Sequence, residues 1–491
     1  MIIRSVIHLS KAFGYFLFSL LFIQLGSAES KENSEKKEGI HTSSEVEIPA
    51  KRNLERAMKL MDASVSHYFT EENGELKLAR YYNPYTQNVS EETGSIWMYT
   101  ASIEAVNAIL KSLEIQKDKG DEDLYHKNFD KYSALIKKLY DNMDFYLGTY
   151  TLTSYTQTKQ WDIYAVDRVG KKGRANVEGK LNVYDDQMWL IRELLQTYKL
   201  TGDEAYLEKA EYLTSYVIDG WDSTLDKEGK EHGGITWGPG YVTKHACSNG
   251  PIISPLVWLS ELYKDKADKI TYRYISSKDQ QTRKDSTQTK RDFYLTFAKK
   301  VYSWQKENLL LTEGVYDDML GGCGACEILY ETVNGEKYRK NTPLNGSAGP
   351  PITYNSGSML SGADDLYHFT EDQRYLEDAI ELSEKSFNHF AKLDQQVPGY
   401  YSFNFDGFNN WFNGVLLRSY VQLYPKHTEV INYINSFQRN LDYSYDNFLR
   451  QGMLPSDLLG GWNSKASKND VEALAAFSIA AQYAVLSEIL E

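Results

Sequence analysis

Helical periodicity is the feature that most constrains the fold of this 491-residue chain. Apolar residues recur three and four positions apart, the spacing that places them on one face of an α-helix. Alternating patterns typical of strands are short and occur only between these segments, for example at Thr149–Tyr155, and the loops are rich in Gly, Asn and Asp. The sequence therefore predicts an all-α fold. About a dozen helices are expected, at Leu54–Tyr68, Ile96–Ile115, Tyr125–Leu147, Met188–Tyr198, Ala205–Val217, Ile252–Tyr263, Arg291–Gln305, Ser358–Phe369, Tyr375–Phe390, Trp411–Tyr424, Val430–Tyr443 and Val471–Leu490.

Two segments repeat one turn motif and indicate how the helices are joined. Thr201–Ala210 reads TGDEAYLEKA and Thr370–Ala379 reads TEDQRYLEDA. Each predicts a tight turn, an N-capping Asp and a helix whose Tyr-Leu-x-x-Ala face packs inward. A linear helical solenoid would repeat with a regular period of roughly 34 to 45 residues, whereas the spacing here is uneven and several loops are long. We therefore expect six hairpins closed into an (α/α)6 toroid, with a cleft among the loops.

The N-terminal residues 1–28 have the features of a secretory signal peptide. Arg4 and Lys11 form a basic region around the start of the apolar run Phe13–Ile23, which small residues follow. That run is shorter than a membrane span, and no Cys lies near it for lipid attachment. Residues 29–51 are charged and polar and predict a disordered linker. We expect a secreted or periplasmic monomer, not inserted in a membrane after signal cleavage, with one domain at 52–491.

Composition narrows the class of partner. The net charge of −14 disfavours nucleic acid and anionic membrane surfaces. The aromatic content of 13%, led by 38 Tyr, favours sugars modestly, because sugar C–H groups stack on aromatic rings. The sequence has no phosphate loop, dinucleotide fingerprint or metalloprotease motif, and its nine His lack ligand spacing. No metal or cofactor is expected.

Consecutive carboxylates stand before the helix predicted from Met188. Asp is favoured at the N-cap and in the first turn of a helix, so Asp185 and Asp186 should lie at a helix N-terminus on the rim of the helical body. Paired carboxylates at a cleft mouth suit glycoside hydrolysis, in which one is the acid/base and the other the nucleophile or base. The alternative is one capping Asp beside a solvated neighbour. A second pair, Asp317–Asp318, competes for the catalytic assignment but precedes no helix, and a third, Asp364–Asp365, should face solvent within a helix.

Several loops carry residues suited to a polar ligand. Trp237 lies in a glycine-rich loop, and Asn249 ends a polar run before a helix; Tyr354 and Asn355 also precede a helix. Each residue also has a structural interpretation, as core, turn or cap. Trp462 could be a stacking platform or could close the core.

Three cysteines are too few for a disulfide framework. Cys323 and Cys326 are expected to form a local disulfide or to remain free thiols, and Cys247 is expected to be a small buried residue.

Four motifs together give the sequence a family resemblance. Tyr184–Trp189 resembles the Tyr-Asp-Asp-x-x-Trp signature of glycoside hydrolase family 76, the endo-α-1,6-mannanases. Gly233–Trp237, Lys244–Gly250 and Thr353–Gly357 are similar to that family's Gly-Gly-Ile-x-Trp, Lys-Asn-Ala-x-Ser-Asn-Gly and Thr-Tyr-Asn-x-Gly motifs, in the same order. The resemblance extends from about Ile96 to the C-terminus.

The sequence also departs from the family pattern. His245 replaces the usual Asn and Ser356 a common Gln, and the Cys323/Cys326 loop and the polar segment Lys266–Lys290 are atypical. These departures concern substrate specificity more than the reaction.

The resemblance implies an (α/α)6 barrel and retaining hydrolysis of α-1,6-mannosidic linkages, with α-mannan as partner. Carried onto this chain, Asp185 is the nucleophile and Asp186 the acid/base. The alternatives are a transglycosidase on the same site and a non-catalytic glycan-binding protein on the same fold. An epimerase or unsaturated uronidase is disfavoured, because an epimerase would need a facing pair of His. The residues expected to contact sugar are Tyr184, Trp237, Asn249, Tyr354 and Asn355.

Overall fold

A computed structural model describes residues 49–323, 326–394, 397 and 400–489. Within these ranges all twelve predicted helices are present, most of them longer than their apolar pattern. They are α2 (Ala50–Tyr68), α3 (Ile96–Asp118), α4 (Glu122–Met143), α5 (Tyr184–Thr201), α6 (Glu204–Asp219), α7 (Ile253–Leu262), α8 (Lys290–Leu309), α9 (Thr353–Thr370), α10 (Gln373–Phe390), α11 (Asn409–Leu423), α12 (Ile431–Phe448) and α13 (Ala473–Leu486).

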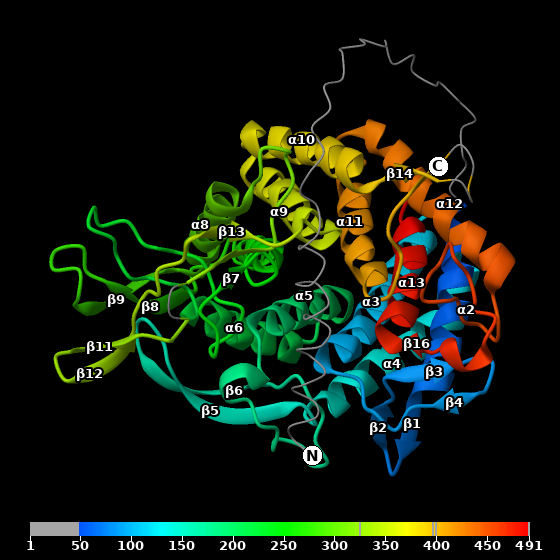
Figure 1. Cartoon of the computed structure of the whole chain (residues 1–491), viewed down its shortest axis with the longest axis horizontal. Helices are drawn as coiled ribbons and strands as arrows, with labels where there is room; N and C mark the ends of the chain where they lie inside the picture. Colours follow the sequence, from blue (N-terminus) through cyan, green and yellow to red (C-terminus); the bar gives the residue numbers. More distant parts are fainter. Residues whose placement is uncertain (1–48, 324–325, 395–396, 398–399, 490–491) are drawn as a thin grey trace, which may run out of the picture. The chain divides into compact units, whose positions relative to one another are not determined.

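The helices form an inner and an outer ring (Figure 1). The inner ring closes on itself, since α3 packs on α5, α5 on α7, α7 on α9, α9 on α11, α11 on α13, and α13 on α3. The outer helices α4, α6, α8, α10 and α12 each pack on the inner helix that precedes them, and α2 packs on α13 and α3. The predicted (α/α)6 toroid is therefore confirmed.

Burial separates the two rings. Outer helices such as α10 have one buried face, whereas every residue of the inner helix α13 is buried. The prediction that Asp364 and Asp365 face solvent is wrong for this reason: α9 is an inner helix and both side chains are buried. Lys426 Nζ lies 2.8 Å from Asp364 Oδ2, and Gln422 donates to both carboxylates, at 3.0 and 2.9 Å.

The repeated turn motif has the predicted structure at both sites. Asp203 and Asp372 are the N-caps of α6 and α10, and each carboxylate accepts a hydrogen bond from the backbone N–H two residues on. The preceding residues, Gly202 and Glu371, have left-handed backbones with φ of 68° and 57°. One local solution thus joins two inner–outer helix pairs.

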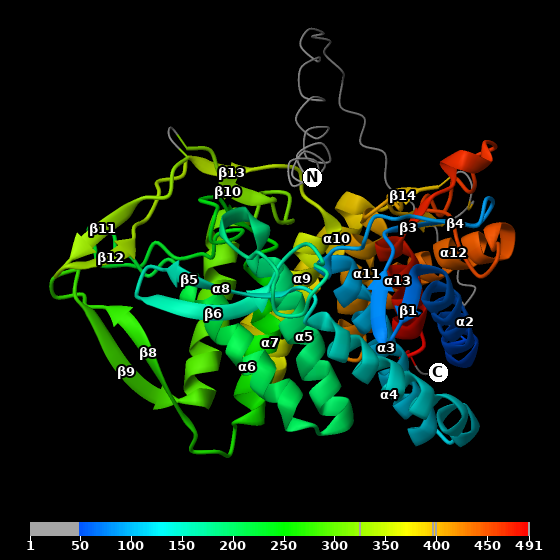
Figure 2. The ribbon, with the colours of Figure 1, turned by 90° about the horizontal axis from the view of Figure 1, so that it is seen from below.

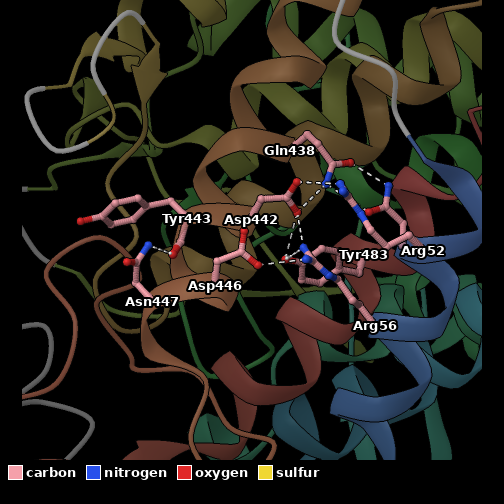
Figure 3. Close-up of polar contacts among 9 residues, drawn as sticks. Arg52, Arg56, Gln438, Asp442, Tyr443, Asp446, Asn447 and Tyr483 are labelled. Carbon is pink, nitrogen blue, oxygen red and sulfur yellow. Dashed lines mark hydrogen bonds and ion pairs between the residues drawn. The ribbon is translucent and has the colours of Figure 1, made fainter.

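A polar network joins α2, the first described helix, to α12 and to Tyr483 of α13 (Figure 3). Arg56 of α2 donates to Asp442 and Asp446 of α12, at 2.6 and 3.0 Å. Arg52 donates to Asp442 at 2.8 Å, and the Gln438 amide donates to it at 2.9 Å. This network supplements the apolar packing of α2 against α13.

The strands lie in the connections between helices. They are β1 (Phe69–Glu72), β2 (Glu75–Leu78), β3 (Tyr81–Asn83), β4 (Asn88–Val89), β5 (Leu147–Thr153), β6 (Thr158–Tyr164), β7 (Lys244–His245), β8 (Lys269–Ile275), β9 (Arg283–Thr289), β10 (Met319–Gly321), β11 (Tyr330–Val333), β12 (Glu336–Arg339), β13 (Gly346–Ala348), β14 (Lys392–Leu393), β15 (Tyr401–Ser402) and β16 (Val471–Glu472). All described pairings are antiparallel, in five two-stranded sheets and two three-stranded sheets ordered β13-β10-β7 and β16-β3-β4. The polar segment at 266–290 is a long hairpin, β8–β9.

One prediction concerns the N-terminal end of the chain. The predicted signal peptide and nearly all of the predicted linker lie outside the described residues, and α2 begins at Ala50. No helix in the described ranges has the length and apolar character that a bilayer crossing requires.

Cys323 and Cys326 are joined by a disulfide, one of the two states that the sequence leaves open.

Candidate active site

The start of α5 places two carboxylates at the mouth of the barrel. The helix N-cap is Val183, so Asp185 and Asp186 lie in the first turn, as predicted from their sequence position. Trp237 fixes this end of the helix, because its carbonyl accepts from the Tyr184 N–H at 2.8 Å. Both carboxylate residues are partly exposed. They are therefore accessible to a ligand and lie at the positive end of the helix dipole.

The environment of the pair is asymmetric. Burial raises the pKa of Asp185 to about 6, although hydrogen bonds from the Cys247 thiol and the Trp237 indole favour its ionised form. Burial and then the charge of Asp185 raise the pKa of Asp186 well above its usual value. One proton is thus retained by the pair near neutral pH, and it resides on Asp186. Two adjacent carboxyls with divided roles suit acid/base chemistry combined with nucleophilic chemistry.

Trp237 and its neighbours form an aromatic wall beside the pair. The Trp237 ring lies 4.7 Å from the Tyr241 ring and 5.1 Å from the His245 ring, between centroids. Burial and then the nearby charges of Asp185 and Asp186 raise the pKa of Tyr241, which places this tyrosine beside the carboxylates. Trp237 and Tyr241 are partly exposed, so they are positioned to contact a ligand.

Two of the residues predicted to contact sugar connect loops. Asn249 has no exposed surface: its carbonyl oxygen accepts from Ile235 N at 2.8 Å and its amide donates to the carbonyls of Ile235 and His245. Asn355 also has no exposed surface and donates to the Asp317 carbonyl at 3.2 Å. In this structure both amides position loops, and their contact with sugar stays a prediction.

The two predicted tyrosines are also buried. Tyr184 is 1% exposed and its ring packs on Tyr216, so it supports α5, and its contact with sugar stays a prediction. The Tyr354 hydroxyl accepts from Trp189 Nε1 at 2.7 Å and donates to the Cys247 carbonyl at 3.3 Å. Tyr354 is 3% exposed and positions the loop of Cys247, and its contact with sugar stays a prediction.

Trp462 contacts Phe448 and Tyr85. Its indole donates to the Phe448 carbonyl at 2.6 Å, and its ring lies 5.7 Å from that of Tyr85. Trp462 packs against the core but is partly exposed, so both interpretations of this residue stand.

A third carboxylate, Asp318, joins the pair. Strand β10 pairs with β7, with Met319 opposite His245, and this register brings Asp318 Oδ2 to 3.9 Å from His245 Nδ1. Burial raises the pKa of Asp318 to about 7, with the charges of Asp317 and Asp185 adding to the effect. Burial lowers the pKa of His245 to about 4, so the imidazole is neutral at pH 7.

Sequence reasoning treated Asp317–Asp318 as a rival location, whereas the fold makes Asp318 a neighbour of Asp185. The signal available in the sequence is that Tyr184-Asp185-Asp186 recurs as Tyr316-Asp317-Asp318. The pairing between β7 and β10 was not visible in the sequence.

A buried ion pair holds the loop that carries Trp237. Lys244 Nζ lies 2.9 Å from Asp222 Oδ2, and these side chains are 4% and 0% exposed. The same ammonium donates to the Gly233 carbonyl at 2.5 Å. The charges are matched and satisfied by hydrogen bonds, which is the condition for a stable buried pair. In the described ranges no group of three or more His, Cys, Asp or Glu side chains is arranged to hold a metal ion.

Comparison with known families identifies the chain. The model of glycosyl hydrolase family 76 matches residues 54–270 and 286–434. The chain belongs to glycosyl hydrolase family 76. This family 76 protein is accordingly a glycoside hydrolase, and the predicted family and enzyme class are confirmed. None of the curated protein sequences compared with it matches.

Solved structures share the fold of this family 76 enzyme. A family 76 mannosidase from Bacteroides thetaiotaomicron aligns over 89% of this chain and 98% of its own, with a TM-score of 0.63 and 18% identity. An inactive variant of an α-1,6-mannanase from a Salegentibacter species, in complex with α-1,6-mannotriose, aligns over 89% and 99%, with a TM-score of 0.57 and 20% identity. An unsaturated glucuronyl hydrolase specific for heparin aligns over 89% and 97%, with a TM-score of 0.51 and 12% identity.

Proposed function

We propose that this enzyme is an exported retaining hydrolase of α-1,6-mannosidic linkages in mannan backbones. The observation that carries the proposal is the asymmetric carboxylate pair at the N-terminus of α5. Asp185 receives hydrogen bonds from Trp237 and Cys247, whereas burial and the charge of Asp185 keep a proton on Asp186. The inactive Salegentibacter mannanase supports the substrate, because two consecutive aspartates are replaced in it and it binds α-1,6-mannotriose. The signal-like N-terminus supports export.

The roles follow from the two protonation states. The ionised Asp185 attacks the anomeric carbon of the mannosyl unit while the bond to the leaving oxygen breaks and Asp186 gives that oxygen its proton. Asp186, now ionised, takes a proton from water, and the resulting hydroxide displaces Asp185 from the glycosyl-enzyme ester. His245 is neutral at pH 7, and the raised pKa of Asp318, about 7, reduces the negative charge beside Asp185 that would oppose this exchange.

Incubation with unbranched α-1,6-mannan, followed by sizing of the products, tests the activity. We expect short oligosaccharides whose first-formed anomer, read by NMR, is α. Release of the β anomer first would contradict retention. The same incubation with an added acceptor glycan distinguishes hydrolysis from transglycosylation, since transfer to the acceptor would produce longer glycans.

Single variants assign the two acids. Asp186→Asn should regain turnover on an aryl mannoside with a good leaving group when azide is added, because azide needs no general base; Asp185→Asn should not be rescued. Asp203→Asn is the matched control, since Asn caps a helix as well as Asp and this residue lies at the start of α6. Equal rescue of both site variants would contradict the assigned roles.

A further inference from the structure

Three β-hairpins meet at one side of the barrel mouth, at the left of Figures 1 and 2. They are β5–β6, β8–β9 and β11–β12. The family model matches up to residue 270 and resumes at 286, so it leaves out most of β8, the turn and the start of β9. The β8–β9 hairpin is therefore an addition to the family pattern. Its contacts show what the addition supports.

A buried arginine at the tip of this hairpin joins the other two. Arg283 donates from Nε and Nη2 to the Tyr155 carbonyl, at 3.1 and 3.0 Å, in the turn of β5–β6. Its Nη2 also lies 2.8 Å from Glu331 Oε1 on β11, and its guanidinium is 4.1 Å from the ring centre of Tyr338 on β12. The Arg283 side chain is 1% exposed. A charge so deeply buried is stable only with its partners in place, so this arginine fixes the position of β11–β12.

The β11–β12 hairpin in turn contacts the loop 239–241, which follows Trp237. Arg339 of β12 donates from Nη1 to the Pro239 carbonyl at 3.0 Å and from Nη2 to the Tyr241 carbonyl. Its backbone N–H donates to the Ser154 carbonyl at 2.9 Å. Tyr241 packs on Trp237 beside the carboxylate pair. The hairpin surface is thus continuous with the wall of the active site.

One exposed aromatic ring stands on that continuation. Tyr330 of β11 is directly opposite Arg339 in the strand register, and directly opposite residues share a face of the sheet. Tyr330 therefore lies on the same face of the hairpin as Arg339, which contacts the loop 239–241. Tyr330 is 44% exposed. Lys337 Nζ lies 4.0 Å from its ring centre, and the remaining ring surface is available to a ligand.

We propose that Tyr330 is an outer sugar-stacking residue, held in place by the β8–β9 hairpin through Arg283. The inference rests on the proposed function and names where the distal part of a long, neutral mannan chain binds. An aromatic face suits this ligand, because the C–H groups of a hexose ring pack on it without any need for charge. The hairpins lengthen the binding surface from the Trp237–Tyr241 wall outward.

Kinetics on two substrate lengths test the inference. Tyr330→Ala should raise KM for unbranched α-1,6-mannan about three- to tenfold, as expected for one aromatic contact, and leave kcat and KM for α-1,6-mannotriose unchanged. Tyr330→Phe keeps the ring and should behave as wild type. Arg283→Met should show the same selective loss as Tyr330→Ala.

Tyr274→Ala is the matched control. Tyr274 is 37% exposed and neighbours Ile275, which pairs with Arg283, so its side chain lies on the opposite face of its hairpin. This variant should keep the wild-type KM for both substrates.

The outcomes separate the two proposals. Wild-type KM for polymer in Tyr330→Ala, or equal losses on polymer and trisaccharide, would overturn the role of Tyr330 and leave the proposed function intact. A wild-type enzyme inactive on both substrates would contradict the proposed function. In that case affinity electrophoresis in gels containing α-1,6-mannan decides the inference: weaker retardation of Tyr330→Ala than of wild type supports it, and equal or absent retardation overturns it.

Discussion

Replacement of Trp237 by Phe should move the acid limb of the pH–rate profile upward. In the proposed mechanism Asp185 must be ionised to act as the nucleophile, and burial has already raised its pKa to about 6. The Trp237 indole opposes that rise by donating a hydrogen bond to the carboxylate. Phe retains an aromatic ring next to Tyr241 and His245 but cannot donate. Activity should therefore be lost at a higher pH as the solution is acidified.

The size of the shift follows from the hydrogen bond removed. A hydrogen bond to a charged group contributes about 1.5–3 kcal/mol, and each pH unit corresponds to about 1.4 kcal/mol. The midpoint of the acid limb should thus move from about pH 6 to about pH 7–8. At pH 6, wild-type Asp185 is about half ionised, so kcat/KM of the variant should fall about 5- to 50-fold. Because Asp185 is partly exposed, water replaces part of the lost interaction and we expect the lower end of this range.

The assay is kcat/KM on an α-1,6-mannooligosaccharide from pH 4 to 9. Tyr241→Phe is the control, since it keeps the aromatic wall and changes no hydrogen bond to Asp185. Cys247→Ala should shift the acid limb in the same direction, because the thiol also favours the ionised form of Asp185. An unchanged acid limb in a folded Trp237→Phe protein would refute the reasoning, even if KM rose through loss of a sugar contact.

Three further predictions concern stability. Lys244→Met leaves Asp222 as an unpaired buried charge and should lower the free energy of unfolding in urea by about 3–5 kcal/mol; a loss below about 1 kcal/mol would show that the pair is dispensable. Burial raises the pKa of Asp219 to about 6, so the folded state binds its proton more tightly than the unfolded state and stability falls as pH rises from about 4 to 6. Asp219→Asn should remove this decline, gaining up to about 3 kcal/mol relative to wild type between pH 4 and 7, whereas parallel pH curves for the two proteins would contradict it. Glu371→Gly should raise the free energy of unfolding by about 0.5–1 kcal/mol, since only Gly adopts this backbone without strain, as Gly202 does at the matching turn; a lower melting temperature would refute this.

The helices were predictable because each presents a regular apolar stripe, and the first turns were missed where that stripe is absent. The helix expected from Met188 begins at Tyr184, and the one expected from Ser358 begins at Thr353. Both starts carry polar residues that serve the site. The same reasoning failed for Asp364, because α9 is an inner helix and buries this carboxylate at 1% exposure.

The site was predictable only in part. The position of Asp185 and Asp186 at a helix start follows from local preferences, but the approach of Asp318 depends on β7 pairing with β10, strands more than seventy residues apart. Burial also has no local signature: Asn249 was indistinguishable in sequence from a ligand-binding amide, and only the fold shows its amide engaged with backbone. The segment that forms β8–β9 is recognisable in the sequence as polar and atypical of the family but not as strands, since exposed polar strands lack apolar alternation.

The packing of α2 against α13 has a consequence for how the chain folds. Arg56 and its partner Asp442 are 386 residues apart in sequence, and α2 has its packing partner in the last described helix. During synthesis from the N-terminus, the part of α2 that packs on α13 remains uncovered until nearly the whole chain has been made. Contacts of such long range form late and slowly, and exposed apolar surface favours aggregation meanwhile. A circular permutant that begins at α13 and continues directly into α2 would make this contact local, and it should refold faster than the natural order.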